Sequence, residues 1–122
     1  MRILILDDER YRHDAFERRF ASEETWHAYT LKQFMNRFIS QPKFNTIYLD
    51  HDIADSKAET GLDAVRFLVD TLKERPDKTP DKIIVHSWNP VGAKAMFEAL
   101  RLAGLNVTLS TFSTKNGIYT EV

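Results

Sequence analysis

The alternation of short apolar runs with helical patterns is the feature that most constrains the fold of this chain. Five runs have the length and composition of strands, and a segment with helical periodicity follows each of the first four. The predicted strands are 2–6, 26–29, 46–49, 82–85 and 106–112. A repeated strand–helix order predicts a mainly parallel sheet with right-handed crossovers and helices on both faces.

The helices are predicted from apolar spacing and from capping residues. The clearest one covers 31–39, where apolar side chains recur at i, i+3, i+4, i+7 and i+8. Thr60 with Asp63 has the pattern of a capping box, and Asn89 followed by Pro90 is typical of a helix start. The other helices are expected over 12–20, 60–72 and 89–104.

The end of the chain carries a turn signal in place of a further helix. Asn116 and Gly117 predict a tight turn, after which residues 118–122 fold back as a short terminal strand. Only about ten residues follow the fifth predicted strand, which is too few for another full helix.

Composition excludes several classes of protein. The chain has 122 residues, a formal net charge of −1 and no cysteine. We therefore expect a single domain over residues 1–122, in the reducing cytoplasm. No apolar stretch approaches the roughly 20 residues that span a membrane. The sequence contains no DNA-binding motif, and its charge provides no general attraction to nucleic acid.

Polar and titratable residues directly follow three of the predicted strands. Asp7 and Asp8 follow the first strand, Asp50–Asp52 the third, and His86–Asn89 the fourth. The carboxyl ends of strands in an open parallel sheet form the usual ligand site. Titratable groups at the end of a buried strand are costly to desolvate unless they bind a cation or take part in chemistry.

This arrangement resembles the receiver domain of response regulators. Asp7 and Asp8 occupy the positions of the receiver acidic pair, Asp50 that of the phospho-acceptor, and Ser87 that of the hydroxyl residue. The resemblance implies a flavodoxin/receiver-like three-layer α/β/α fold with five strands in the order 2-1-3-4-5. Receivers place a lysine after the fifth strand, where this chain has 110–113 without one. Their last helix is missing here, and a homodimer is a candidate to cover the sheet face it would leave open.

A narrower resemblance rests on three spaced motifs. Asp7-Asp8-x-Arg10, Leu49–Asp52 and the run from His86 to Ala93 look like the cyclic-phosphate-processing receiver-like family. That family is proposed to derive from receivers and to act on cyclic phosphates, often in RNA-repair settings. The resemblance covers nearly the whole chain.

The acidic residues suit a hard divalent cation. Mg²⁺ and Mn²⁺ prefer oxygen ligands. We predict a site formed by Asp8 and Asp50, with Asp7 as a third ligand. The alternative is structural: one carboxylate caps the first helix and the other pairs with Arg10 or Arg12.

The two histidines that follow strands are candidates for proton transfer. His51 and His86 would act as general base and general acid on a phosphodiester near neutral pH. Asp52 would orient His51 or replace a metal ligand. In the alternative, His51 is a solvated loop residue, and His86 is a metal ligand or a buried imidazole bonded to the backbone.

A phosphate would bind near the start of the helix after the fourth strand. Ser87, Asn89 and the first turn containing Gly92 form a predicted cradle, since a helix N-terminus attracts anions. Capping by Asn89 alone is the alternative. Arg10 would either clamp the phosphate or only neutralise the acidic cluster. Trp88 would either stack on a base or pack in the core.

The expected function is a phosphodiesterase-type hydrolase. Its substrate would be a 2′,3′-cyclic phosphate at an RNA end or a small cyclic nucleotide. Two other functions stay open: a non-enzymatic receiver relative that accepts phosphate on Asp50, and a module that binds a cyclic nucleotide without turning it over.

Overall fold

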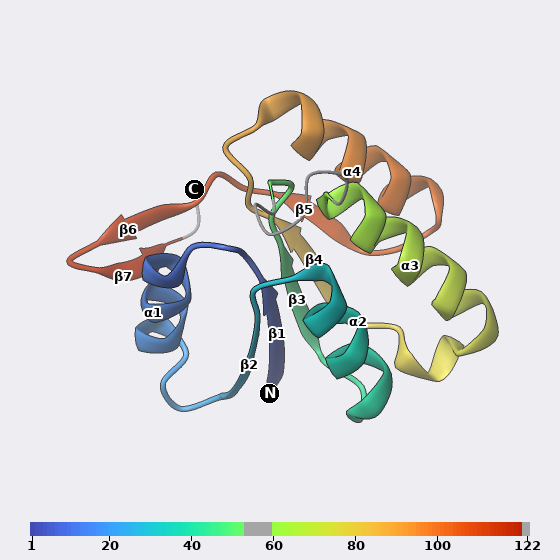
Figure 1. Ribbon diagram of the computed structural model, residues 1–122, viewed down its shortest axis with the longest axis horizontal. Coiled ribbons are helices and arrows are strands. Elements are labelled where there is room, and N and C mark those ends of the chain that lie inside the picture. The colour runs from blue at the N-terminus through green and yellow to red at the C-terminus, as the bar shows by residue number, and fades with distance from the viewer. Residues whose placement is uncertain (53–59, 121–122) are drawn as a thin grey trace.

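A five-stranded parallel sheet forms the centre of the molecule (Figure 1). The computed structural model describes residues 1–52 and 60–120. The strands are β1 (Arg2–Leu6), β2 (Glu24–Ala28), β3 (Thr46–Leu49), β4 (Lys82–Val85) and β5 (Val107–Leu109). Their order, β2-β1-β3-β4-β5, confirms the predicted 2-1-3-4-5 arrangement. The remainder of the predicted loop after β3, residues 53–59, and residues 121–122 of the predicted last strand lie outside the described residues.

The helices follow the capping signals of the sequence. They are α1 (Arg10–Arg19), α2 (Leu31–Ser40), α3 (Gly61–Glu74) and α4 (Pro90–Leu102), with a 3₁₀ turn, η1 (Pro76–Lys78). Thr60 and Asp63 form the predicted capping box of α3, and the Asn89 side chain caps α4 by accepting from the Gly92 N–H. Helix α1 begins two residues before its predicted start. None of the helices in 1–52 and 60–120 is long and apolar enough to cross a membrane.

Alternate side chains of the central strands β1, β3 and β4 enter two separate cores. Leu4 and Leu6 pack on the face covered by α2, α3 and α4, while Ile3 and Ile5 pack on the face covered by α1. Figure 1 shows α1 on one side of the sheet and the other three helices on the opposite side. Strands β1, β3 and β4 are buried on both faces, which explains why they read as continuous apolar runs.

A C-terminal hairpin completes the α1 face. Strands β6 (Ser113–Lys115) and β7 (Ile118–Thr120) are joined by Asn116 and Gly117, whose φ angles of 55° and 76° suit a tight hairpin turn. Tyr119 is fully buried, with its ring centroid 4.3 Å from that of Phe16. Arg18 Nη1 also donates to the Gly117 carbonyl at 3.0 Å.

The hairpin bears on two expectations from the sequence. Strand β5 ends at Leu109, before the predicted 112, because the chain leaves the sheet and Phe112 packs against Phe16 on the α1 face.

The expectation of a homodimer rested on an uncovered sheet face. Phe112 and Tyr119 pack with Ile3 and Ile5 in the core on that face, and the homodimer stays a prediction.

Tyr119→Ala should destabilise the protein by about 3–5 kcal/mol, because it removes a buried aromatic ring from the second core. Ile118→Ala, at the neighbouring residue that is 39% exposed, is the matched control and should cost about 1 kcal/mol or less. Urea unfolding followed by circular dichroism measures both. Equal effects of the two substitutions would contradict a structural role for the hairpin.

Candidate functional site at the carboxyl edge of the sheet

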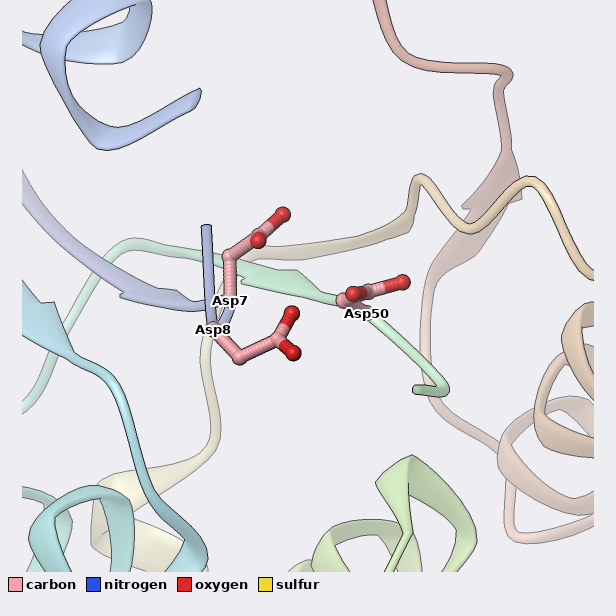
Figure 2. Close-up of side chains that lie close together, drawn as sticks. All are labelled: Asp7, Asp8 and Asp50. Atoms are coloured by element: carbon pink, nitrogen blue, oxygen red, sulfur yellow. The ribbon is translucent and has the colours of Figure 1, made fainter. Parts of the chain in front are cut away.

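Three carboxylates meet where β1 and β3 end (Figure 2). Asp7 and Asp8 follow β1, and Asp50 follows β3, its neighbour in the sheet. One ligand atom from each lies within 4.8 Å of the others. Asp7 and Asp50 are buried, and Asp8 is half-buried. The structure thus brings together the three residues predicted to bind a metal.

Asp7 is held by donors on all sides. Its Oδ1 accepts from the Glu9 N–H at 2.8 Å, and its Oδ2 lies 2.7 Å from His86 Nε2 and 3.3 Å from Arg12 Nη1. Burial alone would raise the pKa of Asp7, but His86, the Glu9 N–H and Arg12 together lower it. Asp7 is therefore a stable buried anion.

Arg12 is the arginine that pairs with this cluster, a choice that the sequence left open between Arg10 and Arg12. Its Nη1 lies 3.3 Å from Asp7 Oδ2 and 3.5 Å from Asp50 Oδ2. This ion pair matches the alternative in which an acid of the pair contacts an arginine. Arg10 is the first residue of α1 and is exposed. Helical spacing was the available signal, because Arg12 lies one turn before the core residue Phe16.

Three aromatic rings fix the Arg12 guanidinium. Its carbon lies 5.1 Å from the Trp88 ring centroid, 5.2 Å from that of Phe112 and 5.6 Å from that of Tyr11. Burial opposes the charge, but the Tyr11 hydroxyl and the two carboxylates raise the pKa of Arg12 further above its usual value. The site therefore contains a permanent, immobile positive charge.

Of the two buried carboxylates, Asp50 is the one whose negative charge is less compensated by its neighbours. Burial and then the negative charge of Asp7 raise its pKa to about 6, although His86, Arg12 and a hydrogen bond from Ser87 act in the opposite direction. A divalent cation would favour the ionised form of Asp50. The donor set consists of oxygens, as Mg²⁺ and Mn²⁺ require. The residues present therefore fit a cation held by Asp8 and Asp50, with Asp7 beside them.

His51 and Asp52 form a hydrogen-bonded pair at the edge of this cluster. His51 Nδ1 lies 2.8 Å from Asp52 Oδ1. A carboxylate accepts, so Nδ1 carries the proton and Nε2 is left as the basic nitrogen. The His51 hydrogen bond lowers the pKa of Asp52, and Asn89 Nδ2 donates to the same carboxylate at 3.4 Å. The structure thus places Asp52 where it orients His51.

Two glycines make room for the His51 segment. A Cβ on Gly92 would lie 2.4 Å from His51 Cγ, so the imidazole packs directly on the first turn of α4. A Cβ on Gly61 would lie 2.2 Å from the Asp50 carbonyl, and the Gly61 N–H donates to the His51 carbonyl at 2.7 Å. The sequence predicted Gly92 as a phosphate contact and did not select Gly61. In the structure the Gly92 N–H is bonded to Asn89 Oδ1.

His86 and Ser87 lie on the inner side of the site. His86 is 0% exposed, and its Nε2 faces Asp7 while the Phe16 ring packs at 5.3 Å. The structure therefore does not bring His86 to the surface that His51 reaches. Ser87 hydrogen-bonds Asp50, and its Oγ accepts from the Asn89 N–H at 3.0 Å.

A further pair of histidines supports the end of β1, although the sequence suggested no catalytic role for them. His13 Nε2 lies 2.7 Å from the Asp7 carbonyl oxygen, which only accepts, so this nitrogen carries the proton. His13 Nδ1 in turn lies 2.7 Å from His27 Nδ1. Burial lowers the pKa of His13 to about 4, so its ring is neutral at pH 7. These contacts hold the Asp7 backbone in place.

The fold and the acidic edge define this protein as a receiver-like α/β domain. A family model described as "Cyclic-phosphate processing Receiver domain" matches residues 2–102. The chain therefore belongs to the cyclic-phosphate processing receiver domain family.

Solved structures support the same fold. The response regulator domain of Thermotoga maritima CheB is 22% identical, with a TM-score of 0.66, and the match covers 91% of this chain and 77% of that chain. Thermotoga maritima TrrA, solved in complex with Mg²⁺-BeF, is 17% identical with a TM-score of 0.66, covering 94% and 88%. The receiver domain of Francisella response regulator 1452 is 15% identical with a TM-score of 0.61, covering 88% and 82%. Comparison with curated proteins found no match.

Asp50→Asn should stabilise the metal-free protein at pH 7. The ordinary pKa of 3.8 applies to the unfolded chain and about 6 to the folded one, so stability falls as pH rises through this interval. The cost at pH 7 is at most about 3 kcal/mol, which the neutral amide removes. Thermal unfolding in EDTA should show a higher Tm for Asp50→Asn at pH 7 and little difference near pH 4.

The exposed Asp70→Asn is the control and should change stability by no more than about 0.5 kcal/mol. Mg²⁺ or Mn²⁺ should raise the Tm of the unmodified protein more than that of Asp50→Asn. A lower Tm for Asp50→Asn in EDTA at pH 7 would contradict this account of the buried charge.

Proposed function

We propose that this protein hydrolyses a cyclic phosphodiester, such as a 2′,3′-cyclic phosphate at an RNA end or in a small cyclic nucleotide. One observation carries the proposal: the acidic cluster of Asp7, Asp8 and Asp50 adjoins the hydrogen-bonded pair His51–Asp52. An acidic cluster alone would equally suit a receiver. The family description names cyclic phosphates as the compounds that its members process.

His51 is the proton-transfer group in this proposal. Water attacks phosphorus, and its proton passes to His51 Nε2 as the new P–O bond forms. Asp52 stabilises the resulting imidazolium through Nδ1, at 2.8 Å. The bond from phosphorus to one ribose oxygen breaks on the side opposite to the attacking water, so that oxygen takes a proton from solvent, and His51 later returns its own proton to solvent. The product is a phosphomonoester with a free hydroxyl.

The acidic cluster and its neighbours would bind the phosphate. A divalent cation on Asp8 and Asp50 would neutralise phosphate charge and polarise its oxygens. The Ser87 hydroxyl donates to Asp50, and it would turn to donate to a phosphate oxygen when a cation takes its place on that carboxylate. Arg10, exposed at the start of α1, remains a predicted phosphate contact.

His86 acts through Asp7 in this proposal and does not contact the substrate. Its ring is fully buried, and its Nε2 lies 2.7 Å from Asp7 Oδ2. His86 therefore positions Asp7 and preserves its charge. Both histidines therefore remain part of the proposed site, with His51 transferring protons and His86 positioning Asp7.

Turnover should depend on His51. We expect hydrolysis of nucleoside 2′,3′-cyclic phosphates in Mg²⁺ or Mn²⁺, and a loss of about 10²–10⁴-fold in kcat for His51→Ala. Added imidazole should restore part of this activity, because it replaces the missing base without repairing the fold. Phosphate release and chromatography of the nucleotide products measure the reaction.

Three results would oppose this proposal. Folded protein that hydrolyses no cyclic phosphate with either metal would overturn it. Full activity in His51→Ala would remove the proposed base. Labelling of Asp50 by a small phosphodonor, with His51 dispensable, would favour a phospho-signalling receiver.

Gly92→Ala should displace the His51 ring, since the added methyl would lie 2.4 Å from Cγ. We expect kcat to fall by about tenfold to a hundredfold, the usual cost of misplacing a catalytic group. The exposed Val91→Ala in the same turn is the control and should leave kcat unchanged. In a double-mutant cycle, Gly92→Ala should cost nothing further in a His51→Ala background. Additive losses would show that Gly92 acts independently of His51.

A further inference from the structure

A pocket of about 290 Å³ lies beside the proposed phosphate site, between the β4–α4 connection and the end of β5. Its walls include Ser87, Trp88, Pro90, Ala93, Leu109 and Thr111. We propose that this pocket binds the nucleobase of the substrate. The inference rests on the proposed function for the position of the phosphate.

Ser87 connects the pocket with the acidic cluster. Its side chain hydrogen-bonds Asp50, and the same residue lines the pocket. A ligand whose phosphate contacts Ser87 therefore has its next chemical group at the pocket entrance. In a nucleoside 2′,3′-cyclic phosphate, that group is the ribose with its base.

The chemistry of the walls selects a neutral flat ring. None of the described residues that line the pocket is charged, so a second phosphate would find no counter-ion there. The walls are mainly apolar, and their hydroxyl-bearing residues are Ser87, Ser110 and Thr111. A volume near 300 Å³ is at the lower end for ligand pockets, which favours one base over a dinucleotide.

Trp88 provides a rigid stacking surface. Its side chain is 60% exposed, which contradicts the alternative that it packs in the core. The indole is nevertheless fixed, because Nε1 donates to the Phe112 carbonyl at 2.9 Å and Arg12 lies 5.1 Å from the ring centroid. A pre-ordered ring loses little entropy on binding. Stacking on such a ring contributes about 1–3 kcal/mol per base.

Substrates with and without a base provide the first test. The unmodified protein should have a KM at least about fivefold lower for adenosine 2′,3′-cyclic phosphate than for glycerol 1,2-cyclic phosphate, as stacking of this strength implies. Leu109→Ala, at a wall residue that is 45% exposed, should reduce this difference. Leu102→Ala, the same substitution at an 82% exposed residue outside the pocket, should leave it intact. Equal KM values for both substrates, with Leu109→Ala unchanged, would overturn the subsite while hydrolysis stands.

A binding measurement separates the subsite from catalysis. The chain has two tryptophans, so Trp26→Phe leaves Trp88 as the sole fluorescent indole. Adenosine 3′-monophosphate should quench it saturably, whereas glycerol phosphate and inorganic phosphate should not. Saturable quenching without turnover would support the base subsite and overturn the hydrolase. Turnover without any quenching would overturn the subsite alone.

Discussion

The burial of the Asp7 carboxylate at the end of β1 is the constraint on which the rest of the site depends. A charge with no exposed surface is tolerated only when donors surround it. Those donors come from three places in the chain: the Glu9 N–H, Arg12 on α1, and His86 after β4. Satisfying one carboxylate therefore fixes the position of α1 against the sheet and the path of the chain beyond β4.

The same network makes the two buried carboxylates unequal. Donors around Asp7 lower its pKa, while burial and the Asp7 charge raise that of Asp50 to about 6. Environments that separate the pKa values of neighbouring acids are typical of sites that bind cations or transfer protons. The ionisation of Asp50 therefore depends on the charge of the group that binds at this edge: a cation would favour the ionised carboxylate, and a phosphate would oppose it. His51 is the next residue in the chain, and its carbonyl accepts from the Gly61 N–H at 2.7 Å, which holds it beside Asp50.

The sequence was sufficient to predict the helices and strands and to select the three acidic residues of the site. Strand periodicity and capping boxes are local signals, and the position of side chains at the carboxyl ends of parallel strands follows from the topology. It could not choose between Arg10 and Arg12, since that choice depends on the rotation of α1 about its axis. It also could not reveal that Gly92 accommodates His51, because this contact joins the segment after β3 to the first turn of α4, 41 positions further along the chain. Contacts between side chains of distant segments can be identified only in the three-dimensional structure, whereas a pattern along one segment can be recognised in the sequence.

This chain differs from the receiver pattern in which residue provides the positive charge of the site. Receivers place a lysine after the fifth strand, but here that connection carries Phe112, and the charge near Asp50 comes from Arg12 on α1. The Arg12 guanidinium contacts two carboxylates and three rings, so its position is determined by more neighbours than a lysine on a loop would have. The chain beyond β5 contributes Leu109 and Thr111 to the pocket that Trp88 also lines. In this chain the connection after β5 therefore forms a pocket wall, and α1 provides the positive charge near Asp50.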